Sequence, residues 1–220
     1  DTLMKRIYLA LIVVVCLAAP AWADTFDPDW LNLVTFTNTT GNTIEFIFLS
    51  PGDSEYWGPE ILGSERVLED DESLGFWILY PDECNDFDIM AIDEDGNTAI
   101  IYDKTICDGQ EIEVEISRKT MRDETPDFDF INVYIKNETI DVWYVFISPG
   151  DSEMWGVDYL DETTILESDG SVSFLFPVGS DTTEYDLMAV DEDMDTYSFS
   201  FDVDEDTDEG VFAIEISDLD

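Results

Sequence analysis

Hydrophobic and polar residues alternate with a period of two over most of the chain, which is typical of half-buried β-strands. In residues 111–116, for example, Ile112, Val114 and Ile116 alternate with glutamates. No window has the 3.6-residue period of a long amphipathic helix, and we expect only a helical turn within residues 57–62 and 155–160. The strands predicted on this basis are residues 43–49, 74–79, 87–92, 98–102 and 111–116, and residues 141–147, 172–176, 185–190, 196–203 and 211–216.

The pattern occurs twice because the chain contains an internal duplication. The segment SPGDSEYWG at residues 50–58 recurs as SPGDSEMWG 98 residues later. The same offset relates FDIMAIDED at residues 87–95 to YDLMAVDED at residues 185–193. Self-similarity at one fixed offset, without gaps, indicates two homologous units.

The turns between the predicted strands contain Gly, Asn and Asp, as expected of short hairpins. We therefore predict an all-β fold of two tandem antiparallel β-sandwich domains, Ig-like or C2-like, that arose by duplication. The first spans residues 25–117 and the second residues 127–220. Residues 118–126 hold three basic residues and end in Pro126, so we expect an exposed linker there.

The start of the chain has the pattern of a secretory signal peptide at residues 4–23. Lys5 and Arg6 precede an apolar run, and Ala21-Trp22-Ala23 resembles a cleavage site. The run is too short for the ~20 residues of a membrane-spanning helix, and we expect no transmembrane segment in the mature chain. The predicted location is outside the cytoplasm: secreted, periplasmic or on the cell surface.

Export would place the remaining cysteines in an oxidising compartment. Once Cys16 is removed with the signal peptide, only Cys84 and Cys107 are left, and a disulfide is their simplest state. Closing that loop would stabilise the fold by about 3 kcal/mol in the chain-entropy view. The alternative is a pair of unlinked thiols.

Charge excludes several classes of function. The chain has 54 acidic residues, 8 basic residues and no histidine, for a net charge of −46. Phosphate would be repelled, so nucleic acid is not an expected partner. The absence of histidine excludes Ser-His and Cys-His nucleophile pairs, and we expect no catalytic function. Because hydrophobic residues make up 45% of the chain, this acidity does not indicate disorder.

Two acidic loops kept their polar residues in both copies. The second loop, at residues 93–97, has acidic or amide side chains at alternate positions, which suits a hard cation such as calcium. Acidic residues of the first loop, which begins at residue 51, could add ligands to the same ion. The candidate ligands are Asp53, Glu55, Asp93, Asp95 and Asn97, with Asp151, Glu153, Asp191, Asp193 and Asp195 in the second copy.

Each loop also has a structural interpretation. The second would be a solvated hairpin turn. In the first, Pro-Gly would make a turn, Asp53 or Ser54 would cap a short helix, and Trp57 would cover the core. A third possibility is that Trp57 and Trp155 stack against sugar rings. The acidity could also be solvation in a salty habitat, since Asp outnumbers Glu 33 to 21.

The motifs SPGDSExWG and DxMAxDED resemble those of uncharacterised secreted bacterial proteins with repeated β-domains. The resemblance implies an exported bacterial protein but assigns no functional residue. We predict a non-catalytic protein that binds divalent cations, calcium first, at its acidic loop ends. The alternative is a metal-independent structural, adhesion or carbohydrate-binding module of the bacterial envelope, whose partner is an envelope protein or a polysaccharide.

Overall fold

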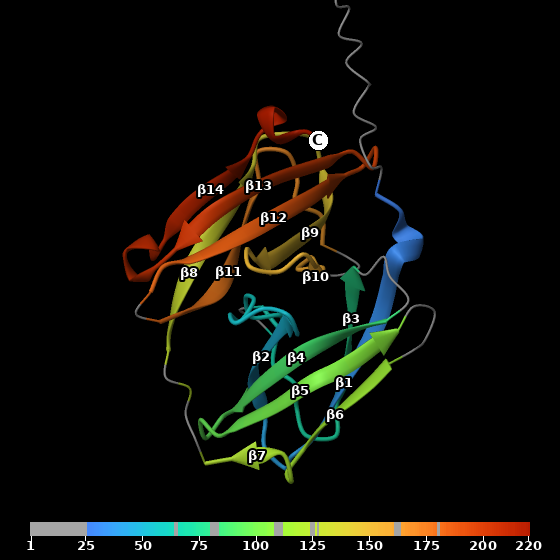
Figure 1. Cartoon of the computed structure of the whole chain (residues 1–220), viewed down its shortest axis with the longest axis vertical. Helices are drawn as coiled ribbons and strands as arrows, with labels where there is room; N and C mark the ends of the chain where they lie inside the picture. The colour runs from blue at the N-terminus through green and yellow to red at the C-terminus, as the bar shows by residue number, and fades with distance from the viewer. Residues whose placement is uncertain are drawn as a thin grey trace, which may run out of the picture.

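In the computed structural model, the regular secondary structure of the described residues is β-strand apart from three short 3-10 turns (Figure 1). The structure describes residues 26–63, 66–79, 84–107, 112–123, 126, 128–160, 164–179 and 181–220. The predicted signal peptide at residues 4–23 and Cys16 lie outside the described residues. Within the described part of the chain, no helix has the length and apolar character needed to cross a membrane.

The first repeat forms two sheets that pack over one core. One contains β1 (Leu31–Thr39), β3 (Ser73–Leu79) and β6 (Ile112–Ser117). The other contains β2 (Ile44–Pro51), β4 (Cys84–Asp93), β5 (Thr98–Cys107) and the two-residue β7 (Met121–Arg122). Residues from both sheets, among them Phe36, Ile78, Ile47 and Phe87, are buried together between them.

The second repeat is built in the same way. One sheet contains β8 (Asp129–Asn137), β11 (Ser171–Val178) and β14 (Gly210–Ile214), and the other contains β9 (Val142–Pro149), β12 (Thr183–Asp191) and β13 (Thr196–Val203). Their core includes Phe176, Tyr185 and Leu187. In Figure 1 the first repeat lies below, in blue to green, and the second lies above, in yellow to red.

The all-β prediction is confirmed, and the predicted strands coincide with observed ones to within a few residues. The expectation of purely antiparallel pairing is wrong, because β6 runs parallel to β1 and β14 runs parallel to β8. In each repeat the last strand thus joins the sheet of the first strand. The segment predicted as a linker contains β7, which pairs with β5 at Thr98 and Ala99.

Strands β1 and β8 precede the strands that the sequence pattern predicts in each repeat. Their buried positions include Asn38 and Asn137, each 0% exposed, which interrupt the hydrophobic pattern. The Asn38 side-chain amide donates to the backbone oxygens of Asn42 and Leu68 at 2.8 Å each. Asn137 does the same with Ile140 and Leu166. These two asparagines therefore anchor the loops that follow the first strand of each repeat.

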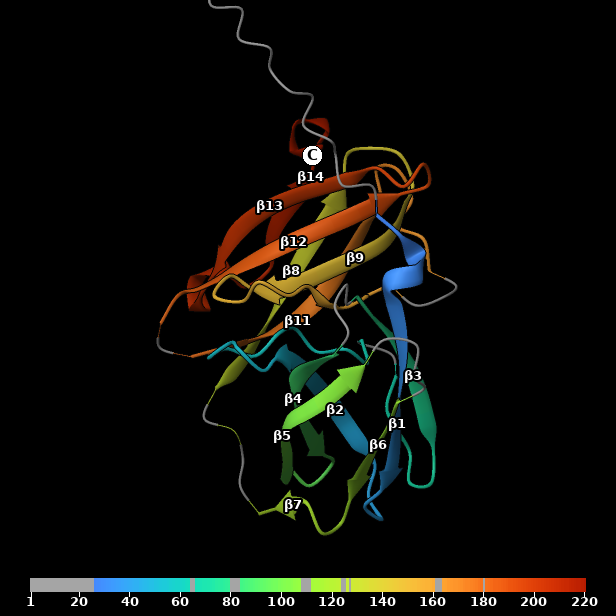
Figure 2. The ribbon, with the colours of Figure 1, turned by 45° about the vertical axis from the view of Figure 1, so that its right-hand side comes forward.

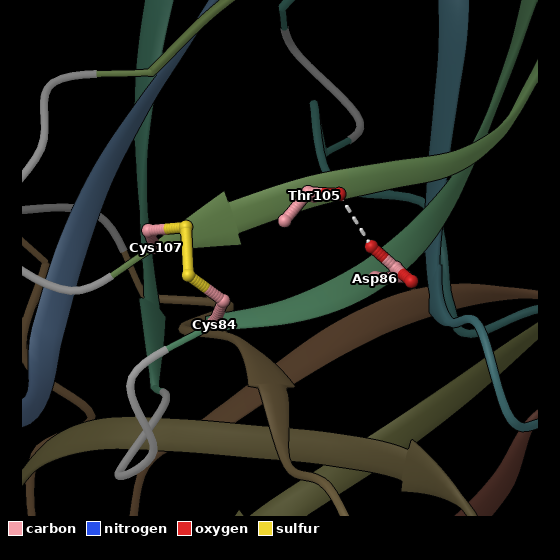
Figure 3. Close-up of a disulfide and its surroundings, with 4 residues drawn as sticks. All are labelled: Cys84, Asp86, Thr105 and Cys107. Carbon is pink, nitrogen blue, oxygen red and sulfur yellow. Dashed lines mark hydrogen bonds between the residues drawn. A yellow bond between two sulfur atoms is a disulfide. The ribbon is translucent and has the colours of Figure 1, made fainter.

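The predicted disulfide between Cys84 and Cys107 is present (Figure 3). The two cysteines face each other at the end of the β4–β5 pair. Two residues further in, the Thr105 hydroxyl donates to the Asp86 carboxylate at 2.6 Å. In the second repeat the position equivalent to Cys84 is Thr182, whose hydroxyl donates to Asp204 at 3.4 Å. The covalent link thus reinforces one repeat only.

Candidate functional site

The two SPGDSExWG segments meet each other in the structure. The Ser54 hydroxyl donates to Asp151 at 2.7 Å, and the Ser152 hydroxyl donates to Asp53 at 2.7 Å. These contacts are reciprocal, because each serine of one repeat bonds the aspartate of the other. The backbone N–H of Glu55 adds a bond to Asp151 at 2.9 Å. Asp53 and Asp151, two of the acids predicted as metal ligands, are therefore partners in the contact between the repeats, and Glu55 takes part through its backbone N–H.

The residues after these loops exchange backbone hydrogen bonds between the repeats. Strand β10 (Gly156–Val157) of the second repeat pairs with β3 of the first and completes its sheet. Asp158 N–H donates to the Trp77 oxygen at 2.8 Å, and Glu60 N–H donates to the Leu175 oxygen at 2.9 Å. The helical turns predicted for residues 57–62 and 155–160 are therefore wrong, because an extended backbone reaches the neighbouring sheet where a helix could not.

Each repeat also inserts aromatic side chains against the other. Phe26 packs on Phe146 and Tyr144, with ring centroids 5.8 and 5.0 Å apart. Reciprocally, Phe130 stacks on Phe48 at 5.6 Å. In Figure 2 the first described residues, in blue, run beside the upper repeat. The faces of β2–β4 and β9–β12 that point away from the core of their own repeat are therefore covered by the other repeat and not by solvent.

Trp57 and Trp155 belong to these interface clusters. Trp57 packs against the cluster of Phe48, Met90 and Ile92, which Phe130 of the other repeat also contacts. Trp155 packs against the cluster that contains Phe146 and Met188. Both tryptophans are half-buried, and the Trp57 backbone oxygen accepts from the Tyr185 hydroxyl at 2.9 Å. This environment favours the structural interpretation of the two tryptophans over the sugar-stacking one.

The acidic loops at residues 93–97 and 191–195 are organised by one buried aspartate each. Asp93, 3% exposed, accepts the backbone N–H of Asn97 and Asp95 at 2.8 and 3.1 Å, and Asn97 and Asn42 add side-chain bonds. Burial alone would raise the pKa of Asp93, but these hydrogen bonds together outweigh it and lower the pKa. Its oxygens hold the turn.

Asp191 plays the same part in the second repeat. It accepts the backbone N–H of Asp193 and Asp195 at 2.8 and 3.0 Å, and the Tyr197 hydroxyl at 2.9 Å. Burial and the bond to Asp191 raise the pKa of Tyr197 to about 12. In each loop the first aspartate, Asp93 or Asp191, thus accepts hydrogen bonds from N–H and O–H groups of the protein itself.

The structure does not bring the two acidic loops of a repeat together. Strand β2 begins at Ile44 beside Asp93 and ends at Pro51, just before Asp53. Eight extended residues span about 23 Å, so one ion cannot contact both loops. Among the described residues, no group of three or more acids, cysteines or histidines is arranged to hold a metal ion. Calcium binding stays a prediction from the sequence.

A cavity of about 480 Å³ lies where the second repeat meets the start of the first. Trp143 and Tyr144 come from β9, Trp77 from β3, and Asp158 follows β10. The Trp143 side chain is 39% exposed at the surface. The remaining lining residues are Pro28, Leu31, Thr164 and Ile165. A concave, mostly apolar site with a few polar groups is typical of a small-molecule binding site.

Asp158 supplies the charge of this aromatic cavity. Its carboxylate accepts the backbone N–H of Val145 and Leu160 at 3.0 and 3.1 Å, which fixes its position. Burial, and then the negative charge of Asp158, raise the pKa of the Tyr144 hydroxyl. None of the described residues that line the cavity is basic.

A second cavity, of about 470 Å³, lies at the other junction and differs in chemistry. It is lined by Glu60 and Arg66, with Ser171 and Ser173 among the others. Glu60 is the counterpart of Asp158, and its carboxylate accepts the backbone N–H of Ile47, Leu62 and Gly63. Burial outweighs these bonds and raises the pKa of Glu60 to about 7.

The two junctions have diverged at the positions that line the aromatic cavity. The counterpart of Trp143 is Glu45, and the counterpart of Trp77 is Leu175. Thr164 corresponds to Arg66. The SPGDSExWG segments that join the repeats are thus alike in both repeats, whereas the cavities at the two junctions have different linings. Sequence reasoning missed Trp77 and Trp143, because residues that differ between the copies give no repeat signal.

Comparison with known proteins adds little. No protein family and no curated protein matches the chain. A structure described as a "putative adhesin" from Bacteroides ovatus matches at 7% identity and a TM-score of 0.26, covering 86% of this chain and 91% of its own. A family 26 carbohydrate-binding module from Eubacterium rectale, in complex with maltoheptaose, matches at 9% identity and a TM-score of 0.22, covering 82% and 90%. Both TM-scores are low, and neither similarity bears on function.

Proposed function

We propose that the chain is an exported, non-catalytic carbohydrate-binding protein whose binding site is the aromatic cavity at one junction of its repeats. The observation that carries this proposal is the lining by Trp77, Trp143 and Tyr144. Indole and phenol rings offer flat apolar faces beside polar edges, which suits the apolar faces of sugar rings. Asp158 and Thr164 supply polar groups that could bond sugar hydroxyls.

The location of the cavity supports a role in binding. The cavity is open enough to leave Trp143 39% exposed, and its volume of about 480 Å³ is within the usual range for small ligands. Its walls come from strands of both repeats, whose reciprocal contacts hold them in place. A site on such paired strands is pre-organised, which reduces the entropic cost of binding.

Titration calorimetry with soluble neutral oligosaccharides, together with tryptophan fluorescence, tests the proposal. We expect at least one neutral disaccharide or longer sugar to bind. Trp143→Ala should weaken binding about tenfold or more, because a tryptophan that becomes buried under a ligand contributes strongly to binding. Tyr102→Ala is the matched control, since Tyr102 is 63% exposed on β5 and does not line the cavity. An equal loss in both variants, or no binding by the wild type, would contradict the proposal.

A further inference from the structure

Strand β14 lies at the edge of its sheet, and among the described strands only β8 pairs with it. The two strands run parallel, and the Ile214 oxygen of β14 accepts from the Glu138 N–H at 2.9 Å. Backbone groups of successive residues point to alternate sides of a strand, so those of Val211 and Ala213 point to the open side. Such a row of backbone groups can pair with another chain.

The equivalent edge of the first repeat, on strand β6, is protected by charge. The buried asparagines of the first strands pair with β6 and β14 at corresponding positions, which aligns these two strands. The counterparts of Val211 and Ala213 are then Glu113 and Glu115, whose side chains are both exposed. Lys104 of β5 also donates to the Glu113 backbone oxygen at 3.3 Å. Charged side chains, lysine above all, are a usual means of preventing edge-to-edge pairing.

Strand β14 has none of these protective charges. Val211 is 62% exposed and, with Ala213, gives this edge an uncharged outer face. The position of Lys104 is taken by Phe201, which is buried and packs on Phe212 of β14. The two repeats therefore have the same edge in two forms, one protected and one open.

Acidic residues lie at both ends of the open edge. Glu209 precedes β14 and Glu215 follows it, and both side chains are exposed. The Glu215 N–H donates to Asp218 at 2.8 Å, which ends the row of open backbone groups. A second copy paired antiparallel through this edge would place Glu209 opposite Glu215, and like charges opposite each other destabilise a strand pair. Basic residues at these positions would be attracted instead.

We propose that the open edge of β14 binds an extended segment of a partner protein by strand addition, and that this segment has uncharged residues between basic ends. The backbone groups of Val211 and Ala213 pair with the segment, as in other cases of strand addition. Its basic ends lie near Glu209 and Glu215. None of the described residues that line the aromatic cavity belongs to β14, so the inference goes beyond the proposed function and does not depend on it.

Synthetic peptides test the inference in the full chain. The probe has alternating valine and threonine between two terminal lysines. One control peptide has glutamate at both ends, and the other keeps the lysines but has proline at its centre. Fluorescence anisotropy at about 0.15 M salt should show the probe binding about tenfold tighter or more than either control, because glutamate is repelled and proline removes a backbone donor.

The proline control separates strand pairing from general attraction to a chain of charge −46. Equal binding of the probe and the proline peptide, or no binding of the probe, would overturn the inference. Hydrogen exchange locates the site: the amides of Val211 and Ala213 should become protected when the probe binds, and those of Glu113 and Glu115 should not. Protection elsewhere and not at β14 would also overturn it.

A pair of proline variants gives a matched control. Ala213→Pro removes an N–H on the open side of β14 and should weaken probe binding about tenfold or more. Glu115→Pro makes the equivalent change in β6 and should leave binding unchanged. Equal effects of the two would overturn the inference, and so would a dimer in sedimentation that Ala213→Pro abolishes, because a second copy would then occupy the edge. The peptide and exchange measurements use the wild type, so the test does not require Ala213→Pro to fold.

Discussion

At the scale of single residues, buried polar groups organise this molecule as much as apolar ones do. Asn38, Asn137, Asp93 and Asp191 are each at most 3% exposed. All four side chains accept or donate several hydrogen bonds, within their own loops and, for the two asparagines, also to a residue about 30 positions away. A buried polar group of this kind is costly unless it is fully bonded, so it specifies one loop conformation.

Glu60 should make stability depend on pH. Below about pH 4.5 it is protonated in both the folded and the unfolded chain. Between about pH 4.5 and 7 the unfolded chain releases the proton while the folded chain retains it, so the free energy of unfolding falls as the pH rises and levels off above about 7. The loss is about 3 kcal/mol at most.

Urea denaturation of Glu60→Gln at about pH 5 and about pH 8 checks this expectation. Repulsion among the 54 acidic residues causes a similar trend, so the reference is Glu45→Gln, which removes an exposed acid. Stability should fall less with pH in Glu60→Gln than in Glu45→Gln. The same pH dependence in both variants would show that Glu60 is not the source.

At the scale of elements, the sequence pattern predicts which residues are buried but not which part of the molecule covers them. The apolar alternation predicted most strands, and the fixed offset identified the duplication. In β2, however, Phe48 faces the other repeat while Ile47 and Leu49 face their own core. A run buried on both faces looks the same whichever surface covers it. The partners of Asp53 and Ser54 are nearly 100 residues away, so no local pattern could identify them.

The loop that carries the inter-repeat contact has a tight backbone approach at Gly58. A Cβ atom there would lie 2.7 Å from the Leu49 oxygen and 3.0 Å from the Tyr159 hydroxyl of the other repeat. We expect Gly58→Ala to lower the free energy of unfolding by about 1–3 kcal/mol, since backbone and neighbour must shift. Chemical denaturation measures this.

Gly179→Ala is the control for that experiment. No atom lies within 4 Å of its added Cβ, and its backbone is not in the left-handed region. Its stability should stay within about 0.5 kcal/mol of the wild type. If Gly58→Ala were equally harmless, the close approach at this loop would not be a determinant of the fold.

At the scale of the whole molecule, the two repeats form one pseudo-symmetric body. The contacts between the repeats lie outside the predicted linker at residues 118–126. They are the reciprocal hydrogen bonds, the backbone pairing of β10 with the first repeat, and the two aromatic clusters. The linker therefore connects the repeats without supplying these contacts.

Cleavage of the linker tests this view. A protease site inserted between Asp123 and Pro126 should be cut without separating the halves, because the interface does not need the covalent connection. Gel filtration at micromolar concentration should give the same elution volume before and after cutting. Two smaller species after cleavage would mean that the inter-repeat contacts are too weak to hold the halves together.

The reciprocal contacts between Ser54 and Asp151 and between Ser152 and Asp53 have the form of a twofold interface in a homodimer. Joining two such subunits in one chain removes the requirement that both junctions be identical. One junction could then acquire Trp77 and Trp143 while the other kept Leu175 and Glu45. A symmetric dimer would bind two ligands, or none, at its equivalent junctions. The fused chain should bind one ligand, at the junction that has the two tryptophans.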